Sequence, residues 1–497
     1  MDFISSPRRS WALFYSTILL ALLLFAVGLL GLGSVSTEAR IRDVACLRLL
    51  ADTTDGRQAL VSSVWWAPLP TLARLPFVFL IKAEHPPVAS ILVSALFGAG
   101  TLALLSQVLL GWNSRRSRLL MMAGLAVNPF FLAECVNGSS GTLVIFLTVL
   151  VAYGLLTWTE KRSLKSLSVF GLAVGLLLIS SAEMVLWVVA ALFLLVVHEE
   201  RSGASRAERK AVILLAVFPA IYAVGIWVLA NWLIMGDALY FVRSLLFAGP
   251  VRGALTAGDL GSSLFLLLCG MGGAVLTGDA LLRRDGRGLC LGLLAVAPLG
   301  VAWILSLRHY LWETVPLVFS LLPLGVLSLG YLLKSRPAMA GGLRTTVAAM
   351  PLIMAGLAWQ VPGTAAFGYG RSGADQMVSE GAAWQSRIGA HVLRQSPFSK
   401  VFVCGYGSFG LLGARDDRLF VHSLDFNFYR AAHDYVGHSM YMLVHRPVGR
   451  MAMDSIHWKY DMLYTQGAYS TLYYGDWGDW RLFEIIRGPR EETDATP

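Results

Sequence analysis

About eleven separate apolar stretches run through the sequence as far as about residue 360, and this repetition limits the fold more than any other feature. A helix needs about 20 predominantly apolar residues to cross roughly 30 Å of hydrocarbon. The stretches have about that length, so the sequence predicts an α-helical polytopic membrane protein. The predicted spans are 11–33, 86–110, 119–135, 141–158, 166–181, 183–197, 211–234, 261–281, 289–307, 313–333 and 341–361. The fifth and sixth are short and adjoin each other, which indicates either a tight helical hairpin or one broken element.

Clusters of basic residues fall in alternate loops between these spans. They are Arg8-Arg9, Arg115-Arg116 with Arg118, Lys161-Arg162 with Lys165, the segment 201–210, Arg283-Arg284 with Arg287, and Lys334 with Arg336. Cytoplasmic loops of membrane proteins carry an excess of Lys and Arg. The pattern therefore predicts a multi-pass protein of the cytoplasmic (inner) membrane, with a cytoplasmic N-terminus and an extracytoplasmic C-terminus.

The composition agrees with a membrane protein and argues against a nucleic-acid partner. The mean hydropathy is +0.63, and 56% of the residues are hydrophobic while 14% are charged. The formal net charge of +9 comes largely from the loop arginines, so we attribute it to topology and contact with lipid headgroups. No nucleic-acid-binding motif is present, and the five cysteines form no CxxC pair. Membrane lipids are the expected partners.

The chain divides into two predicted domains. Residues 1–361 form a transmembrane domain that includes an outer loop, 34–85, and residues 362–497 form an extracytoplasmic α/β domain. In the outer loop, 37–51 has helical spacing with Thr37 as the cap, and the proline-broken apolar piece 64–81 is expected to lie at the membrane interface. For the C-terminal domain the pattern predicts a helix at 374–395 and strands at 400–404, 418–421, 440–445, 461–463 and 481–486.

Several segments, taken in order, resemble those of one superfamily of membrane enzymes. They are Ser36 to Ala45 after the first span, Trp66-Ala67-Pro68-Leu69-Pro70, Asn128-Pro129-Phe130, the stretch Asn231 to Phe241, and Arg308-His309-Tyr310-Leu311 followed by Pro316-Leu317. This series resembles the GT-C superfamily of polytopic glycosyltransferases, which includes protein mannosyltransferases and the lipid A aminoarabinose transferase. The resemblance covers about residues 10–335 and is carried chiefly by order and topology.

The resemblance implies a transferase that uses a polyprenyl-phosphate-linked sugar and passes it to a lipid, glycan or protein acceptor. Members carry an acidic residue in the first outer loop, often with a divalent metal such as Mg²⁺ or Mn²⁺, and Glu38 matches that residue. Asp43 is the reserve base. An arginine offers a planar fork to a leaving phosphate, so Arg308, with Tyr310 and Arg243, is expected to bind the donor phosphate.

One departure keeps other functions open. Related sequences often carry an acidic residue where the third and fourth spans join, whereas the stretch Cys135 to Thr142 contains no carboxylate. Glu183, between the fifth and sixth spans, does match an acidic position. The missing acidic residue leaves open a catalytically inactive scaffold of the same fold. A lipid or glycan transporter or flippase is the alternative from another class of membrane protein.

Each candidate residue also has a structural explanation. Glu38 could be a capping carboxylate, and Asp43 could form a salt bridge with Arg40 or Arg42. Glu183 could sit in a hydrated turn, and Arg308 could extend its charge to the interface.

Overall fold

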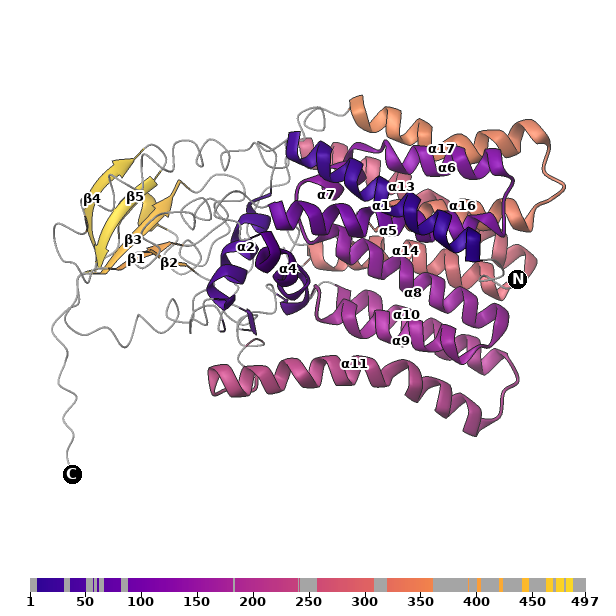
Figure 1. Ribbon diagram of the computed structural model, residues 1–497, viewed down its shortest axis with the longest axis horizontal. Coiled ribbons are helices and arrows are strands. Elements are labelled where there is room, and N and C mark those ends of the chain that lie inside the picture. Colours follow the sequence, from indigo (N-terminus) through magenta and orange to yellow (C-terminus); the bar gives the residue numbers. More distant parts are fainter. Residues whose placement is uncertain are drawn as a thin grey trace.

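Long helices lie side by side in one bundle, and a β-sheet lies beyond one end of it (Figure 1). The structure, a computed structural model, describes residues 7–30, 36–50, 57, 60–61, 67–81, 88–181, 184–239, 241, 257–307, 320–360, 392, 400–403, 420–422, 440–446, 462–467, 471–477 and 480–485.

Most bundle helices follow the predicted spans closely. They are α1 (Pro7–Leu30), α5 (Val88–Leu110), α8 (Gly141–Lys161), α9 (Leu164–Leu178), α10 (Met184–Arg201), α11 (Arg206–Met235), α13 (Ala257–Arg283), α14 (Gly286–Leu307), α16 (Leu321–Ser335) and α17 (Gly341–Gln360). Among the described residues, α5, α8 and α11 are each long and apolar enough to cross a membrane. The other apolar helices are shorter by the same measure, so the total of about eleven spans stays a prediction.

The third predicted span, 119–135, is wrong as a single helix. It consists of α6 (Arg115–Ala126) and α7 (Pro129–Val136), which meet at an angle of 63°. Asn128 causes the break, because its side-chain Oδ1 accepts hydrogen bonds from the backbone N–H groups of Phe130 and Phe131, at 3.1 and 3.4 Å. Pro129 then starts α7, where a missing N–H costs nothing.

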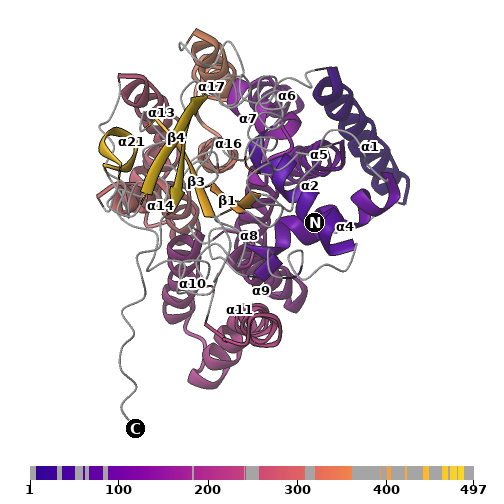
Figure 2. The same ribbon diagram turned by 90° about the vertical axis from the view of Figure 1, so that its left-hand side faces the viewer.

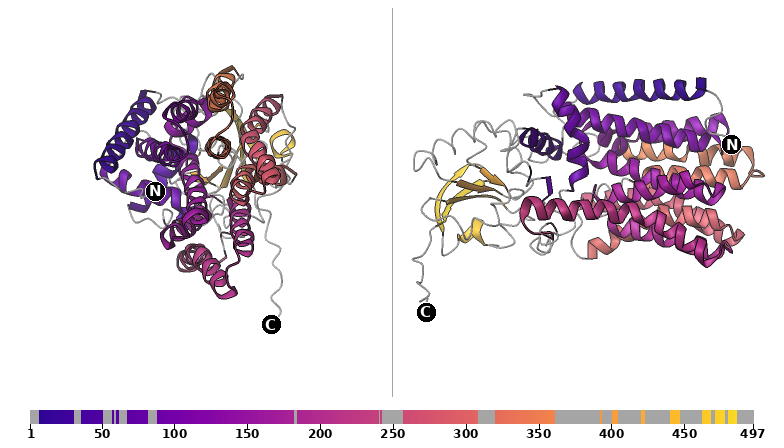
Figure 3. Two further views of the ribbon diagram at one scale, coloured as in Figure 1. Left: turned by 90° about the vertical axis from the view of Figure 1, so that its right-hand side faces the viewer. Right: turned by 60° about the horizontal axis from the view of Figure 1, so that its bottom comes forward.

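The fifth and sixth predicted spans are two separate helices, α9 and α10, which run side by side as a hairpin (Figure 1). Glycines allow α9 to approach its neighbours closely. An alanine Cβ at Gly154 of α8 would lie 2.8 Å from the backbone nitrogen of Phe170, and one at Gly175 would lie 2.6 Å from the carbonyl oxygen of Pro219 on α11. Small residues commonly permit such packing in membranes. Figure 3 shows α11 along one side of the bundle.

The end of the bundle remote from the sheet carries buried acidic residues that are paired with arginines. Glu199 is fully buried and accepts hydrogen bonds from Arg162 at 2.6 and 2.8 Å and from the indole N–H of Trp158 at 2.9 Å. Asp279 pairs with both Arg283 and Arg336. These contacts hold the predicted cytoplasmic loops against the helix ends, at the opposite end from the sheet.

The sheet has five strands in the order β2-β1-β3-β5-β4. The strands are β1 (Lys400–Val403), β2 (Phe420–His422), β3 (Met440–His445), β4 (Thr471–Trp477) and β5 (Trp480–Ile485). Strand β1 is parallel to β2 and β3, while β5 is antiparallel to β3 and β4. Phe402, Met442 and Phe483 belong to its buried core. Figure 2 shows the sheet in front of the bundle end.

Four predicted strands match described strands and one does not. In the predicted strand 461–463, the described residues Met462 and Leu463 do not form a strand, because the short helix α21 (Leu463–Gln466) begins there and packs Leu463 onto the sheet. Strand β4 was not predicted. The predicted helix 374–395 lies outside the described residues apart from Val392, and the division into two domains at residue 361 stays a prediction.

Candidate functional site

Helix α2 (Thr37–Leu50) follows the first bundle helix and is almost the helix expected from the sequence. The predicted cap, Thr37, is wrong by one residue. Ser36 is the cap, because its hydroxyl accepts a hydrogen bond from the backbone N–H of Ala39 at 3.1 Å. The N–H of Ser36 also donates to the carbonyl oxygen of Asn137 at 2.8 Å. The start of α2 is therefore fixed against the turn between α7 and α8, residues 137–140.

Helix α4 (Pro68–Ile81) is the second piece of the outer loop, and its prolines do not prevent a helix. Its polar residues Thr71 and Arg74 are buried, whereas Phe79 and Leu80 are exposed. The helix therefore turns its cation towards α2 and part of its apolar surface outward. This is the orientation expected of a helix that lies at the membrane interface.

Glu38 lies in the first turn of α2 and contacts two other segments through its carboxylate. The guanidinium Nε of Arg42 donates to Glu38 Oε1 at 2.6 Å, and the backbone N–H of Ser140 donates to Oε2 at 3.2 Å. Burial favours the neutral acid, but Arg42, Arg74 and the Ser140 hydrogen bond outweigh it and lower the pKa of Glu38 to about 2. The side chain is still 28% exposed, so an ionised carboxylate faces outward here.

A second acidic side chain, Glu134, lies close enough to Glu38 for the two charges to interact, and the sequence analysis missed it. The expectation that the junction of the third and fourth spans lacks an acidic residue is therefore wrong, since Glu134 is one residue before the stretch 135–142. The hydroxyl of Ser139 donates to Glu134 Oε2, and the amide of Asn137 donates to Oε1 at 3.5 Å. The sequence did contain a signal for Glu134, because it is the lone ionisable residue in an apolar segment. Such a residue is costly to bury and is often functional.

Arg42 and Asp43 are buried beside these residues, in different contacts. Arg42 Nη1 donates to the hydroxyl of Thr71 at 2.8 Å and to the carbonyl of Ala67 at 3.1 Å. Asp43 Oδ1 accepts a hydrogen bond from Ser90 at 2.7 Å, and its Oδ2 has no partner among the described residues. Burial raises the pKa of Asp43 above its usual value. Of the two arginines expected to pair with Asp43, Arg42 pairs with Glu38 instead, and the side chain of Arg40 lies outside the described residues, so a salt bridge with Arg40 stays a prediction.

The donor set of the described residues does not by itself make a metal site. No three His, Cys, Asp or Glu side chains within the described ranges are grouped closely enough to hold an ion. Both oxygens of Glu38 accept hydrogen bonds, and Glu134 is buried behind Ser139. A bound Mg²⁺ or Mn²⁺ stays a prediction.

Several predicted site residues lie outside the described residues: Glu183, Arg243, Arg308 and Tyr310. The stretch Asn231 to Phe241 is mostly described and ends α11, where Gly236 adopts a positive φ of 71° and its N–H bonds to the carbonyl of Trp232 at 3.1 Å. Nearby, the indole N–H of Trp227 donates to the carbonyl of Val61 at 3.2 Å. The end of α11 is thus tied to the first outer loop.

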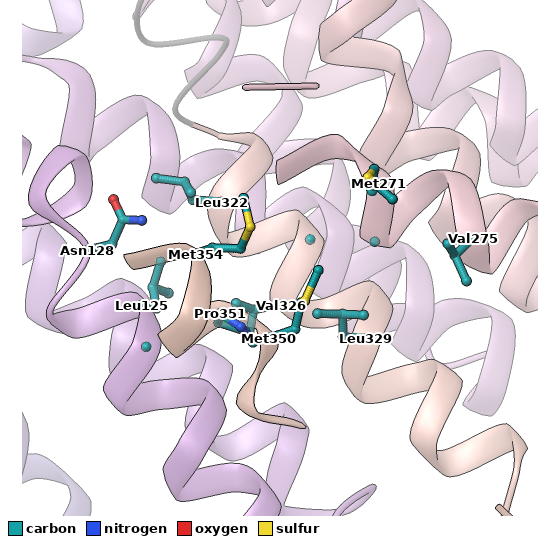
Figure 4. A pocket seen from close by; sticks show the side chains of 13 residues that line it. Leu125, Asn128, Met271, Val275, Leu322, Val326, Leu329, Met350, Pro351 and Met354 are labelled. Carbon is teal, nitrogen blue, oxygen red and sulfur yellow. The ribbon is translucent and has the colours of Figure 1, made fainter. Parts of the chain in front are cut away.

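A separate cavity of about 110 Å³ lies among α6, α13, α16 and α17 (Figure 4). Met271, Met350 and Met354 line it together with other apolar side chains, and Asn128 contributes the amide that Figure 4 shows at its edge. Its described lining contains no ionisable side chain. The cavity can therefore hold apolar groups, and neither Glu38 nor Glu134 lines it.

Comparison with known proteins identifies the architecture. No protein-family model matches the sequence, and neither does any curated protein. The crystal structure of ArnT from Cupriavidus metallidurans in the apo state is similar, with a TM-score of 0.51 and 13% identity, over 98% of this chain and 100% of that chain. ArnT is an aminoarabinose transferase of GT-C type. This chain has the GT-C fold. The similarity to ArnT extends over nearly the whole of this chain and all of that one. At 13% sequence identity it shows a shared fold and no more.

Another similar structure is the apo oligosaccharyltransferase from Archaeoglobus fulgidus, with a TM-score of 0.47 and 12% identity, over 86% of this chain and 69% of that chain.

In this GT-C chain, the outer-loop helices α2 and α4 and the α7–α8 turn meet at the bundle end nearer the sheet (Figure 1). This meeting point contains the partly exposed Glu38, the buried Asp43 and Glu134, and two buried arginines.

Proposed function

We propose that this protein is a membrane glycosyltransferase that moves a sugar from a polyprenyl-phosphate carrier to a lipid, glycan or protein acceptor on the outer face of the cytoplasmic membrane. The observation that carries the proposal is the ionised, partly exposed Glu38, held by Arg42 and Ser140 at one end of a GT-C bundle. A reaction there would take place at headgroup depth, where a lipid-linked phosphate and a water-soluble or lipid acceptor can meet.

The contacts of Glu38 define its part in such a reaction. General bases work best when their pKa lies near the working pH, and a pKa of about 2 makes Glu38 a weak base. A fixed negative charge is instead suited to orient the hydrogen of an attacking hydroxyl or amide. It also stabilises the positive charge that develops on a sugar ring as its glycosidic bond breaks. Glu134 is buried, so it acts on reactants only through its neighbours, chiefly Ser139.

The leaving phosphate needs cationic donors. Arg308, Tyr310 and Arg243 are proposed for this role, because Arg308 follows a predicted span at its outer end. Arg42 and Arg74 are buried by more than nine-tenths and already bind backbone or side-chain acceptors. They are therefore better suited to hold the site than to bind the donor.

Purified protein in lipid should transfer label from a polyprenyl-phosphate sugar to an acceptor, and Glu38→Gln should lower kcat by about 100-fold or more. The substitution keeps the size but leaves the buried Arg42 without its counter-ion, so the melting temperature should also fall, and kcat is compared at a temperature at which the variant is folded. Glu208→Gln, at the exposed first turn of α11, is the matched control and should keep full activity. Full activity in Glu38→Gln would contradict the assignment and leave Asp43 as the next candidate.

The alternative of an inactive scaffold rested on the missing acidic residue, and Glu134 removes that support. The alternative of a transporter or flippase predicts that the same purified protein moves lipid between leaflets and transfers no sugar. A transfer assay and a lipid-flipping assay on one preparation therefore separate the two functions.

A further inference from the structure

Arg74 is the most deeply buried charged side chain near Glu38, and the role proposed for Glu38 does not use it. It is 1% exposed and lies on α4. Its Nη2 donates to the carbonyl oxygen of Gly138 at 2.7 Å, and its Nη1 donates to that of Pro70 at 3.4 Å. Gly138 has a positive φ of 77°, a backbone conformation that favours glycine.

The turn that Arg74 holds is the one that contacts both carboxylates. Ser139 binds Glu134, and the backbone N–H of Ser140 binds Glu38. Two further contacts reach the same turn: Ser94 donates to the carbonyl oxygen of Ser139 at 3.1 Å, and the N–H of Ser36 donates to that of Asn137. Of these contacts, only that from Arg74 carries a full positive charge, and hydrogen bonds from charged groups are the stronger kind.

The charge of Arg74 also acts on Glu38 across a buried space. Arg74 and Arg42 together lower the pKa of Glu38. Among the described residues, the charge of Glu38 acts on Glu134 of α7, and the charge of Arg74 acts on Asp43 of α2 as well as on Glu38. Removing Arg74 would leave Arg42 as the described cation that acts on Glu38.

We propose that Arg74 is a positioning residue: its guanidinium fixes the α7–α8 turn through Gly138 and so sets the placement of Glu38 and Glu134. The kinetic consequences of this inference rest on the proposed transferase function. The clamp itself, which is the contact of Arg74 with the carbonyl oxygen of Gly138, is a property of the fold. A displacement of a catalytic group by about 1 Å can cost roughly 100-fold in rate. A residue that contacts no reactant should change kcat and leave KM nearly constant.

Arg74→Lys keeps the positive charge and loses the planar fork. In hydrogen–deuterium exchange, the amides of residues 137–141 should exchange at least about tenfold faster than in the wild type. In the transfer assay, kcat should fall by roughly 10- to 100-fold with donor KM within about twofold. The control is Arg162→Lys, which weakens a contact of a partly exposed arginine with the buried Glu199, at the other end of the bundle. It should leave both readouts unchanged.

Arg74→Gln adds a pH readout. With one of the two cations gone, the pKa of Glu38 should rise from about 2, so activity that needs the ionised carboxylate should be lost at a higher pH on acidification than in Arg74→Lys. A purely structural loss would lower activity equally at every pH. Arg74→Lys keeps the test decisive if Arg74→Gln does not fold.

Unchanged exchange at 137–141 in Arg74→Lys would overturn the clamp. A raised donor KM with unchanged kcat would also overturn it, since Arg74 would then bind the donor phosphate. Absence of transfer by the wild type would count against the transferase and not against the clamp, which the exchange measurement tests without any substrate.

Discussion

At the scale of single residues, Gly141 leaves the space that the Glu134 carboxylate occupies. An alanine Cβ at position 141 would overlap Glu134 Oε2, so Gly141→Ala must displace the carboxylate and break its hydrogen bond with Ser139. We expect transfer to fall by roughly 10- to 100-fold. Stability should fall by about 1–3 kcal/mol, because the packed site must shift. A steady-state transfer assay and a thermal melt would measure the two effects.

The matched control for that variant is Gly278→Ala in α13, where a new Cβ would meet no atom within 4 Å. It should keep full activity and gain slightly in stability, by about 0.5–1 kcal/mol, because alanine favours a helix over glycine. Equal activity of the two alanine variants would show that the position of Glu134 does not matter for transfer.

The two carboxylates also show how far single-residue reasoning from the sequence reached. Glu38 could be chosen from its place in the first outer loop, and the structure adds the Arg42 and Ser140 contacts that no spacing reveals. Glu134 was missed because it was counted as part of a continuous span. Only the break at Asn128 places it near the end of a short helix, next to the turn that contacts the start of α2.

At the scale of elements, that break depends on Asn128. Asn128→Ala removes the cap of α7 and should lower stability by about 0.5–2 kcal/mol. Because α7 carries Glu134, transfer should also fall, by about tenfold. Ser205→Ala removes the same kind of cap from α11, where Ser205 accepts a hydrogen bond from the N–H of Glu208 at 3.2 Å. It should cost similar stability without affecting transfer; equal transfer losses in both variants would contradict a specific role of α7.

The positions of apolar helices were predictable, because hydrophobic length fixes them, and α5, α8 and α11 end within a few residues of the expected limits. The short elements outside the bundle were harder to predict from the sequence. Strand β4 alternates weakly and has a register irregularity between Tyr473 and Gly475, and α21 is a single turn in a segment with strand-like composition. Their conformations depend on packing against β5 and β3, which a local pattern does not contain.

At the scale of the whole molecule, charge and architecture agree. The segments at 115–118, 161–165, 201–210, 283–287 and 334–336 lie at one end of the bundle, while α2, α4 and the sheet lie at the other (Figure 1). One end is therefore rich in arginine and lysine, and the opposite end carries the partly exposed Glu38. This separation is what the positive-inside rule requires if the candidate site faces away from the cytoplasm.

The topology can be tested with a reporter that is active only in the cytoplasm. A fusion after Pro497 should give no signal, because the C-terminus is expected on the outer face. A fusion after Ser335, at the end of α16 beside the basic residues Lys334 and Arg336, should give a strong signal. The two fusions differ by one predicted span and the C-terminal region, so each is the control of the other. A strong signal after Pro497 with none after Ser335 would invert the topology and place Glu38 on the cytoplasmic face, where the proposed outer-face transfer could not occur.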